Sequence, residues 1–136
     1  MTWRRKRLPP AMEDASAAFL AVLAEIEPSK AALTEVMPTT RMPGRPFPDA
    51  LSELEDHLER AASLMPAWRR DEVEDVWRAC DAGLAQARST ARRFREDAPE
   101  LGGFEGVIGA VEELLTPLEP FREGAERFRR LRTRRT

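Results

Sequence analysis

Chemically reactive side chains are scarce in this chain of 136 residues. It contains one histidine, His57, one cysteine, Cys80, and no tyrosine. A single cysteine cannot form a disulfide within the chain, and a zinc site with several Cys or His ligands cannot be assembled. A Ser-His-Asp triad would have to be built around His57 on a helix that offers no nucleophile elbow. The composition therefore excludes the commonest nucleophilic and zinc-dependent chemistries.

Glycine-rich and paired-ligand motifs are also missing. Four of the seven glycines lie between residues 102 and 109, but no strand pattern and no lysine of the required spacing accompany them. A phosphate-binding loop needs both features. Di-iron bundles need paired Glu-x-x-His units, whereas the residue three before His57 is Leu54. We therefore expect no catalytic residues, no cofactor and a non-enzymatic protein.

The chain has no long hydrophobic run. No segment reaches the ~20 apolar residues that span a bilayer. A basic stretch at 3–7 precedes an uncharged, alanine-rich stretch at 15–24, which is the order found in signal peptides. Glu13 and Asp14 interrupt that order, and the apolar spacing continues past Glu25 as an amphipathic helix, so we expect no signal peptide. With a single cysteine, the expected location is the reducing cytoplasm.

What the chain does have is apolar or small residues at alternating intervals of three and four. One series is Val73, Trp77, Cys80, Leu84, Ala87, Ala91 and Phe94, and another is Phe104, Val107, Val111, Leu114, Leu118, Phe121, Ala125 and Phe128. A repeat of about 3.5 residues follows one side of an α-helix, which can be buried only against other helices. The pattern predicts a bundle of long helices, with Cys80 as a buried small hydrophobe.

Prolines divide the chain into four predicted helices. The first starts at Pro9 and Pro10, ends before Pro38, and has a kink or a short restart at Pro28. Residues 38–48 include four prolines, of which Pro38 is the first. This composition excludes regular structure and stiffens the backbone. This segment is therefore a predicted connector.

The middle of the chain contains the second and third predicted helices. Asp49 is the predicted N-cap of the second helix, which Pro66 closes, and Phe47 should pack onto the end of the bundle. Helix three begins either at Pro66 or after Asp71, and both alternatives stay open. It is expected to end at about Asp97.

The last predicted helix, 104–128, is interrupted at Pro117 and Pro120. Thr116 and Glu119 have the spacing of a capping box. Because the apolar series keeps its phase across the interruption, both halves should pack on the same core, with a bend between them.

These elements together predict an all-α protein with one domain spanning 1–136. The expected architecture is a single four-helix bundle, mostly antiparallel in up-down-up-down order, with proline kinks in helices one and four. Residues 1–9 form a basic N-terminal arm, 38–48 the proline-rich connector, and 132–136 a basic C-terminal tail.

Charge is segregated along the chain, although the net charge is only −2. Residues 1–10 carry +4, residues 122–136 carry +5, and residues 11–121 carry −11. In the predicted topology, the start of helix one, the turn between helices two and three, and the end of helix four lie at one pole of the bundle. We call this end the basic pole.

The basic pole is a candidate anion-binding site. Its candidate residues are Arg4, Arg5, Lys6, Arg7, Arg69, Arg70, Arg127, Arg129, Arg130, Trp3 and Trp68. Tryptophan beside arginine suits stacking on exposed bases as well as a membrane interface, so nucleic acid or an anionic membrane is one alternative partner. In the other interpretation, nearby acids cancel the field and the last arginines complement the helix dipole.

Two pairs of carboxylates suggest a second alternative. Asp56 and Glu59 lie near the end of helix two, and Glu72 and Asp75 near the start of helix three. The pattern resembles the Glu-x-x-Glu and Glu-x-x-Asp pairs of all-α nucleotide pyrophosphohydrolases of the MazG type. That resemblance implies a Mg²⁺ ion held against a pyrophosphate, with Asp56 in place of the expected glutamate. Since Asp56, Glu59 and Asp75 fall outside the apolar series, they should face solvent.

The favoured functional hypothesis is a non-enzymatic interaction or regulatory module in the cytoplasm. Its partner is another protein or a second copy of the chain, which would form a homodimer. A second apolar series consists of Ala62, Val76, Ile108 and Leu115. Whether these four residues are buried within one chain or exposed bears on the choice between a monomer and an assembly.

Overall fold

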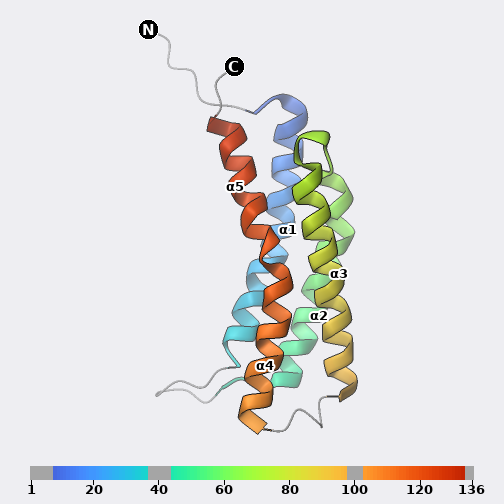
Figure 1. The fold of residues 1–136 in the computed structure, drawn as a ribbon, viewed down its shortest axis with the longest axis vertical. Coiled ribbons are helices and arrows are strands. Elements are labelled where there is room, and N and C mark those ends of the chain that lie inside the picture. Colours follow the sequence, from blue (N-terminus) through green and yellow to red (C-terminus); the bar gives the residue numbers. More distant parts are fainter. Residues whose placement is uncertain (1–7, 37–43, 98–102, 134–136) are drawn as a thin grey trace.

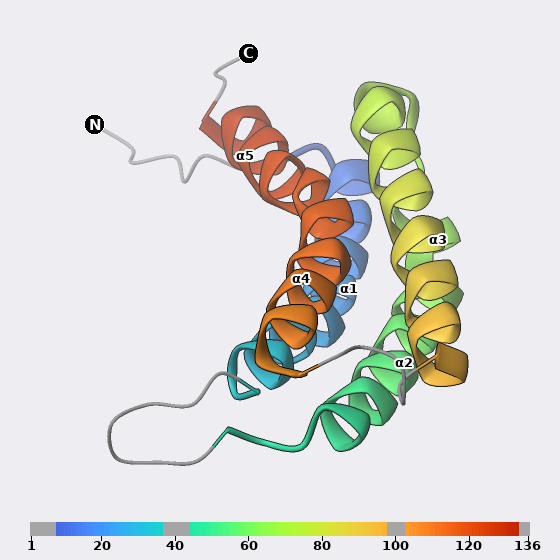
Figure 2. The same cartoon turned by 60° about the horizontal axis from the view of Figure 1, so that its bottom comes forward.

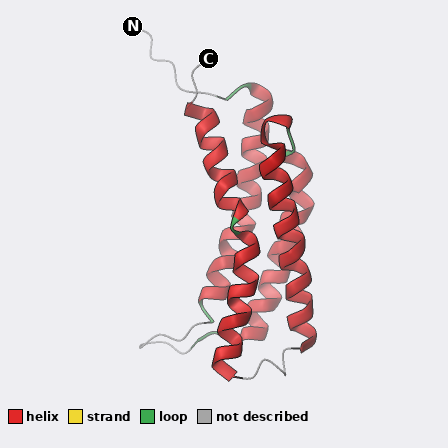
Figure 3. Ribbon diagram, viewed as in Figure 1, coloured by secondary structure: helices red, strands yellow, loops and turns green. Residues whose placement is uncertain are grey.

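The computed structural model describes residues 8–36, 44–97 and 103–133 (Figure 1). Five α-helices lie in this part of the chain: α1 (Pro10–Thr34), α2 (Phe47–Leu64), α3 (Glu74–Asp97), α4 (Gly103–Leu115) and α5 (Pro120–Thr133). Short 3-10 turns, η1 (Met65–Trp68), η2 (Asp71–Val73) and η4 (Thr116–Leu118), join some of them. Figure 3 shows helices and loops, and no strand, over these residues. The predicted all-α class is confirmed.

The helices form a four-helix bundle, because α4, η4 and α5 make up one continuous column (Figure 1). Along the sequence colours of Figure 1, α1 and α3 run down the page and α2 and the α4–α5 column run up it. α1 packs on α2, α2 on α3, and α3 on both α4 and α5, while α4 also contacts α1 (Figure 2). The start of α1, the α2–α3 turn and the end of α5 thus lie at one end of the bundle.

α1 is continuous from Pro10 to Thr34, so the restart considered at Pro28 is not found. Pro28 removes one backbone donor from the helix interior. The helix ends before Pro38, as predicted, and Pro9 precedes its first residue. Residues 37–43 of the predicted connector lie outside the described residues.

α2 begins at Phe47, so the prediction that Asp49 is its N-cap is wrong. Pro46 occupies the cap position and Pro48 lies in the first turn, where a missing N–H costs no helical hydrogen bond. The end of the connector is therefore helical. Phe47 is buried and its ring centroid lies 6.3 Å from that of Phe94, which confirms its expected packing.

The third helix begins after Asp71, which resolves the alternative left open by the sequence. η1 ends at Trp68, Arg69 and Arg70 are extended, and α3 starts at Glu74 after η2. The Glu74 carboxylate accepts hydrogen bonds from the guanidinium groups of Arg69 and Arg78.

The interruption of the fourth column occurs at η4, and both halves pack on the same core. Phe121 is fully buried and Phe128 is 6 % exposed, as predicted. Thr116 does not cap the following turn: its Oγ1 donates to the carbonyl of Glu112 at 2.9 Å. Ala125 is exposed, and the neighbouring Gly124 takes its expected place in the core.

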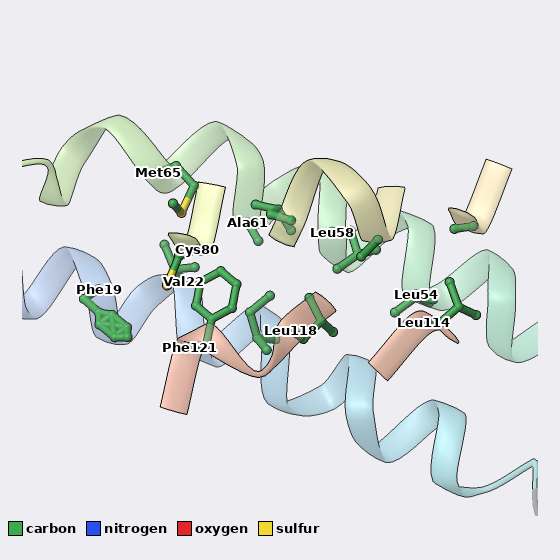
Figure 4. Packing of buried hydrophobic residues seen from close by; sticks show 14 of the residues in the cluster. Phe19, Val22, Leu54, Leu58, Ala61, Met65, Cys80, Leu114, Leu118 and Phe121 are labelled. Atoms are coloured by element: carbon green, nitrogen blue, oxygen red, sulfur yellow. The ribbon is translucent and has the colours of Figure 1, made fainter. Parts of the chain in front are cut away.

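Aromatic and aliphatic side chains from all four columns fill the core (Figure 4). The Phe19 ring centroid lies 4.8 Å from that of Trp68 and 5.1 Å from that of Phe128. Cys80 is fully buried, and burial raises the pKa of its thiol to about 12. This confirms Cys80 as a core residue.

The second apolar series is divided between the core and the surface. Val76 is buried, while Ala62 and Leu115 are partly buried against the core. Ile108 is half-buried. Most of this series is thus covered within one chain.

Candidate interaction surface

Trp68 cannot serve as an exposed platform for bases or lipids. It is 0 % exposed, its ring packs on Phe19, and its Nε1–H points at the Met65 sulfur at 3.3 Å. The interpretation of Trp68 as an anion-site residue is therefore wrong. Trp68 follows Met65 by three residues and extends the apolar series of the second helix, a signal that was available in the sequence.

Several arginines of the basic pole are engaged by acids of the same chain. The Arg127 guanidinium makes two hydrogen bonds with the Asp75 carboxylate, at 3.0 and 2.7 Å, and a third with the carbonyl of Glu72. Arg69 pairs with Glu74 at 2.7 Å and lies 4.2 Å from the ring centroid of Trp77. Arg129 forms an ion pair with Glu126. Much of the positive charge here is thus compensated locally.

These ion pairs also shift the pKa values of their members. The guanidinium groups of Arg69 and Arg78 lower the pKa of Glu74 to about 2. Arg127 lowers the pKa of Asp75, chiefly through its hydrogen bonds, and Asp75 in turn raises the pKa of Arg127. The carboxylates therefore stay charged, and keep their arginines occupied, down to acidic pH.

The other candidates at this pole are placed as follows. Arg70 donates to the carbonyls of Ala67 and Arg69, and Arg130 is exposed on α5. Trp3, Arg4, Arg5, Lys6 and Arg7 lie outside the described residues.

The four carboxylates of the predicted magnesium site are not brought together. Asp56 and Glu59 line an open depression of about 260 Å³ on α2, which Arg95 of α3 borders. Arg95 is ~30 Å along the helix from Asp75, because each residue adds 1.5 Å. The two pairs therefore lie at different levels, contrary to the sequence-based expectation, since Asp75 is near the other end of α3.

The remaining observations agree with this separation. Asp56, Glu59 and Asp75 are exposed, as their place outside the apolar series predicted, and Glu72 is exposed as well. Within 8–36, 44–97 and 103–133, no three His, Cys, Asp or Glu side chains are grouped so that they could hold a metal ion.

His57 lies in a polar contact between α1 and α2. Its Nδ1 is 3.5 Å from Oε1 of Glu25 and its Nε2 is 3.7 Å from Oε1 of Glu53. Arg60 donates to the Glu25 carboxylate at 2.6 Å, and this bond lowers the pKa of Glu25. The Arg60–Glu25 ion pair thus ties α2 to α1, and His57 lies half-buried beside it.

The outward face of α1 has little charge. Ala17, Leu20, Ala21, Ala24 and Ala31 are exposed at helical spacing. Leu20 is 60 % exposed, and within the described ranges no other large hydrophobic side chain is comparably exposed. Small residues allow a second helix to approach closely, so this face has the shape and polarity of a helix-docking surface.

The outward face of α2 illustrates the contrast. It presents Asp56, Glu59 and Arg60 to solvent over little more than one helical turn. On α1, by comparison, the only charged side chain between Asp14 and Glu27 is Glu25, which is directed towards α2. A helix that is apolar on both sides is expected to be covered on both sides.

No helix in the described segments is both long enough and apolar enough to cross a membrane. Comparisons with models of protein families, with curated proteins and with solved structures give no match to this chain.

Proposed function

We propose that this protein is a non-enzymatic, helical-bundle interaction module that binds a protein partner through the outward face of α1. The observation that carries the proposal is the exposure of Leu20 within an uncharged stretch of alanines. Apolar surface of this kind is stabilised by burial, at roughly 1.5–3 kcal/mol for a leucine that becomes fully covered. The face would act as one half of a helix–helix contact.

Charge distribution favours α1 over the basic pole as the contact surface. A ligand of the pole would compete with Asp75 for Arg127 and with Glu74 for Arg69, since these pairs are already formed. A partner of α1 displaces only water from Leu20 and the alanines beside it. The free energy of desolvation is therefore favourable on α1.

Site-specific photocrosslinking in cells that express the full chain tests the proposal. A benzophenone amino acid placed at Leu20 should give one adduct of defined mass. The same probe at Ser63, an exposed position on the outward side of α2, is the matched control.

The control decides how the result is interpreted. An adduct from position 20 and none from position 63 supports α1 as the contact surface. Equal yields from both positions, or no adduct from position 20, would overturn the proposal.

A further inference from the structure

The single histidine of the chain lies between carboxylates of two helices. The His57 side chain is 15 % exposed, and its Nδ1 is 3.5 Å from Oε1 of Glu25 on α1. Its Nε2 is 3.7 Å from Oε1 of Glu53, one turn earlier on α2. Each ring nitrogen thus faces the carboxylate of a different helix. A protonated imidazole donates from both nitrogens, whereas a neutral imidazole donates from only one.

Arg60 determines where the neutral ring carries its proton. Its Nη2 lies 3.1 Å from Nδ1 of His57, while its Nε donates to Oε1 of Glu25 at 2.6 Å. A guanidinium can only donate, so Nδ1 must accept this hydrogen bond through its lone pair. The ring proton is therefore assigned to Nε2, on the side of Glu53. In this state, Arg60 links His57 to the Glu25 carboxylate.

A second proton on the ring does not fit the same set of contacts. An N–H group at Nδ1 would point at an N–H group of Arg60, and both side chains would be cations. The Glu25 oxygen, by contrast, is near enough to Nδ1 to accept its proton in a hydrogen bond after a small movement. Arg60 can leave the ring because its side chain is 55 % exposed, so Nη2 can donate to water instead. Protonation should therefore exchange Arg60 for Glu25 as the partner of Nδ1.

The charged groups that face the ring are two carboxylates and one guanidinium. Glu25 comes from α1, and Glu53 and Arg60 come from α2. Arg45, which precedes α2, pairs with the Glu53 carboxylate. Once Nη2 of Arg60 has turned away, a protonated ring has a carboxylate at each nitrogen.

Charges on the other sides of α2 have little influence on the ring. Arg95 of α3 bonds Glu55, which lies two positions before His57 and therefore on a different side of the helix. Asp56 and Glu59 are exposed to solvent, which screens their charges, and their sign favours a cationic ring.

Glu25 and Glu53 keep their negative charges in mildly acidic solution. The hydrogen bond from Arg60 lowers the pKa of Glu25 from its ordinary 4.5, and the hydrogen bond from Arg45 does the same to the pKa of Glu53. Histidine is the side chain that ordinarily changes its charge between pH 5 and 8. Both acceptors are therefore charged over the range in which a histidine becomes protonated.

We propose that His57 is a pH-operated clamp between α1 and α2. The neutral ring accepts a hydrogen bond from Arg60. The protonated ring bonds Glu25 and Glu53 directly and releases Nη2 of Arg60 to solvent. This switch is independent of the function proposed for the outward face of α1, because none of these side chains belongs to that face.

Nitrogen-15 NMR of the purified full-length chain, without a histidine tag, tests both states of the ring. Because the chain has one histidine, its ring signals belong to His57. At pH 8 the shifts should be those of the Nε2–H tautomer, and at pH 5 both ring N–H protons should exchange slowly with water. The Nδ1–H tautomer at pH 8, or ring protons that exchange at pH 5 as fast as in free histidine, would overturn the proposal.

Double-mutant cycles measure the exchange of partners directly. The Tm at pH 8 and pH 5 is compared for the parent chain, for His57→Ala, Arg60→Gln and Glu53→Gln, and for the two double variants that contain His57→Ala. The coupling of His57 with Arg60 should raise the Tm at pH 8 and vanish or change sign at pH 5. The coupling of His57 with Glu53 should raise the Tm more at pH 5 than at pH 8.

Glu55→Gln is the matched control, because it removes a carboxylate two positions from His57 on the same helix. Its coupling with His57 should be negligible at both pH values. Couplings with Arg60 and Glu53 that are the same at pH 8 and pH 5 would overturn the exchange, and so would an equal change in the coupling with Glu55. The NMR measurement uses the parent chain, so a variant that fails to fold leaves that test intact.

Discussion

The ring of Phe19 lies directly over Gly124, so closely that a Cβ on Gly124 would be 2.6 Å from Cζ of the ring. This contact joins α1 to α5 in the middle of the aromatic cluster with Trp68 and Phe128. The glycine therefore sets how near α5 can come to α1.

Gly124→Ala should destabilise the bundle. Alanine is favoured over glycine in a helix by about 1 kcal/mol, but overpacking a core costs about 1–3 kcal/mol, so the clash should prevail. Urea unfolding measures the change. Gly109→Ala on α4 is the matched control, because nothing lies within 4 Å of its added Cβ, and it should stabilise the protein. Equal effects of the two substitutions would contradict the packing argument.

Gly83→Ala should be more damaging than Gly124→Ala. Its Cβ would lie 2.0 Å from the carbonyl oxygen of Pro117, which is backbone and cannot rotate away. Replacing Phe19 by Leu should reduce the loss of stability caused by Gly124→Ala. It should not reduce the loss caused by Gly83→Ala. Double-mutant cycles from thermal unfolding test this difference, and relief of both substitutions by Phe19→Leu would argue against it.

Glu74→Gln should lower stability in a pH-dependent way. The folded-state pKa of Glu74 is about 2, below its ordinary value of 4.5. Stability from a depressed carboxyl pKa is present above the unfolded value and is lost as pH falls towards the folded value. The Tm difference between the parent and Glu74→Gln should therefore be largest above pH 4.5 and shrink towards pH 2. A constant Tm difference over this pH range would show that Arg69 and Arg78 do not stabilise the charged carboxylate of Glu74.

Cys80 should react slowly with thiol reagents in the folded protein. It is fully buried and its pKa is raised to about 12, so thiolate is scarce at neutral pH. Absorbance of a released chromophore measures the rate, and denaturant should accelerate the reaction. Moving the thiol one residue, with Ala79→Cys and Cys80→Ala, places it at an exposed position and should give fast labelling. Fast labelling of native Cys80 would contradict its burial.

The helical columns could be predicted because burial imposes a period on the sequence. Leu114, Leu118 and Phe121 are fully buried at the positions that the spacing indicated. The same period misplaced Ala125, because the buried position between Phe121 and Phe128 is taken by Gly124, where the Phe19 ring leaves no room for a side chain. A fixed repeat of apolar residues does not reveal that contact.

Charge pairing was harder to predict because it depends on which helices are neighbours. Glu123 precedes Arg127 by four residues, which is the spacing of an ion pair within a helix. The structure nevertheless pairs Arg127 with Asp75, 52 residues away. The capping box predicted at Thr116 and Glu119 is not formed, because the Thr116 hydroxyl bonds the carbonyl of Glu112 in its own helix.

The candidate contact face could be predicted only in part. The alanine-rich stretch could be recognised in the sequence, but its exposure could not be predicted. A helix that is apolar on all sides is typical of a buried helix. Leu20 and Leu23 differ by one turn, and only the structure shows that the first is exposed and the second packed against the core.

Arg45 closes the gap between the first two helices. Its backbone N–H donates to the carbonyl of Glu35 at 2.8 Å, and its guanidinium pairs with the carboxylates of Glu35 and Glu53. Glu35 and Arg45 are thus joined directly, although residues 37–43 separate them in the sequence. Because loop closure becomes only slowly less favourable with length, this is where a peptide tag or a new pair of chain ends could be introduced without disturbing the bundle.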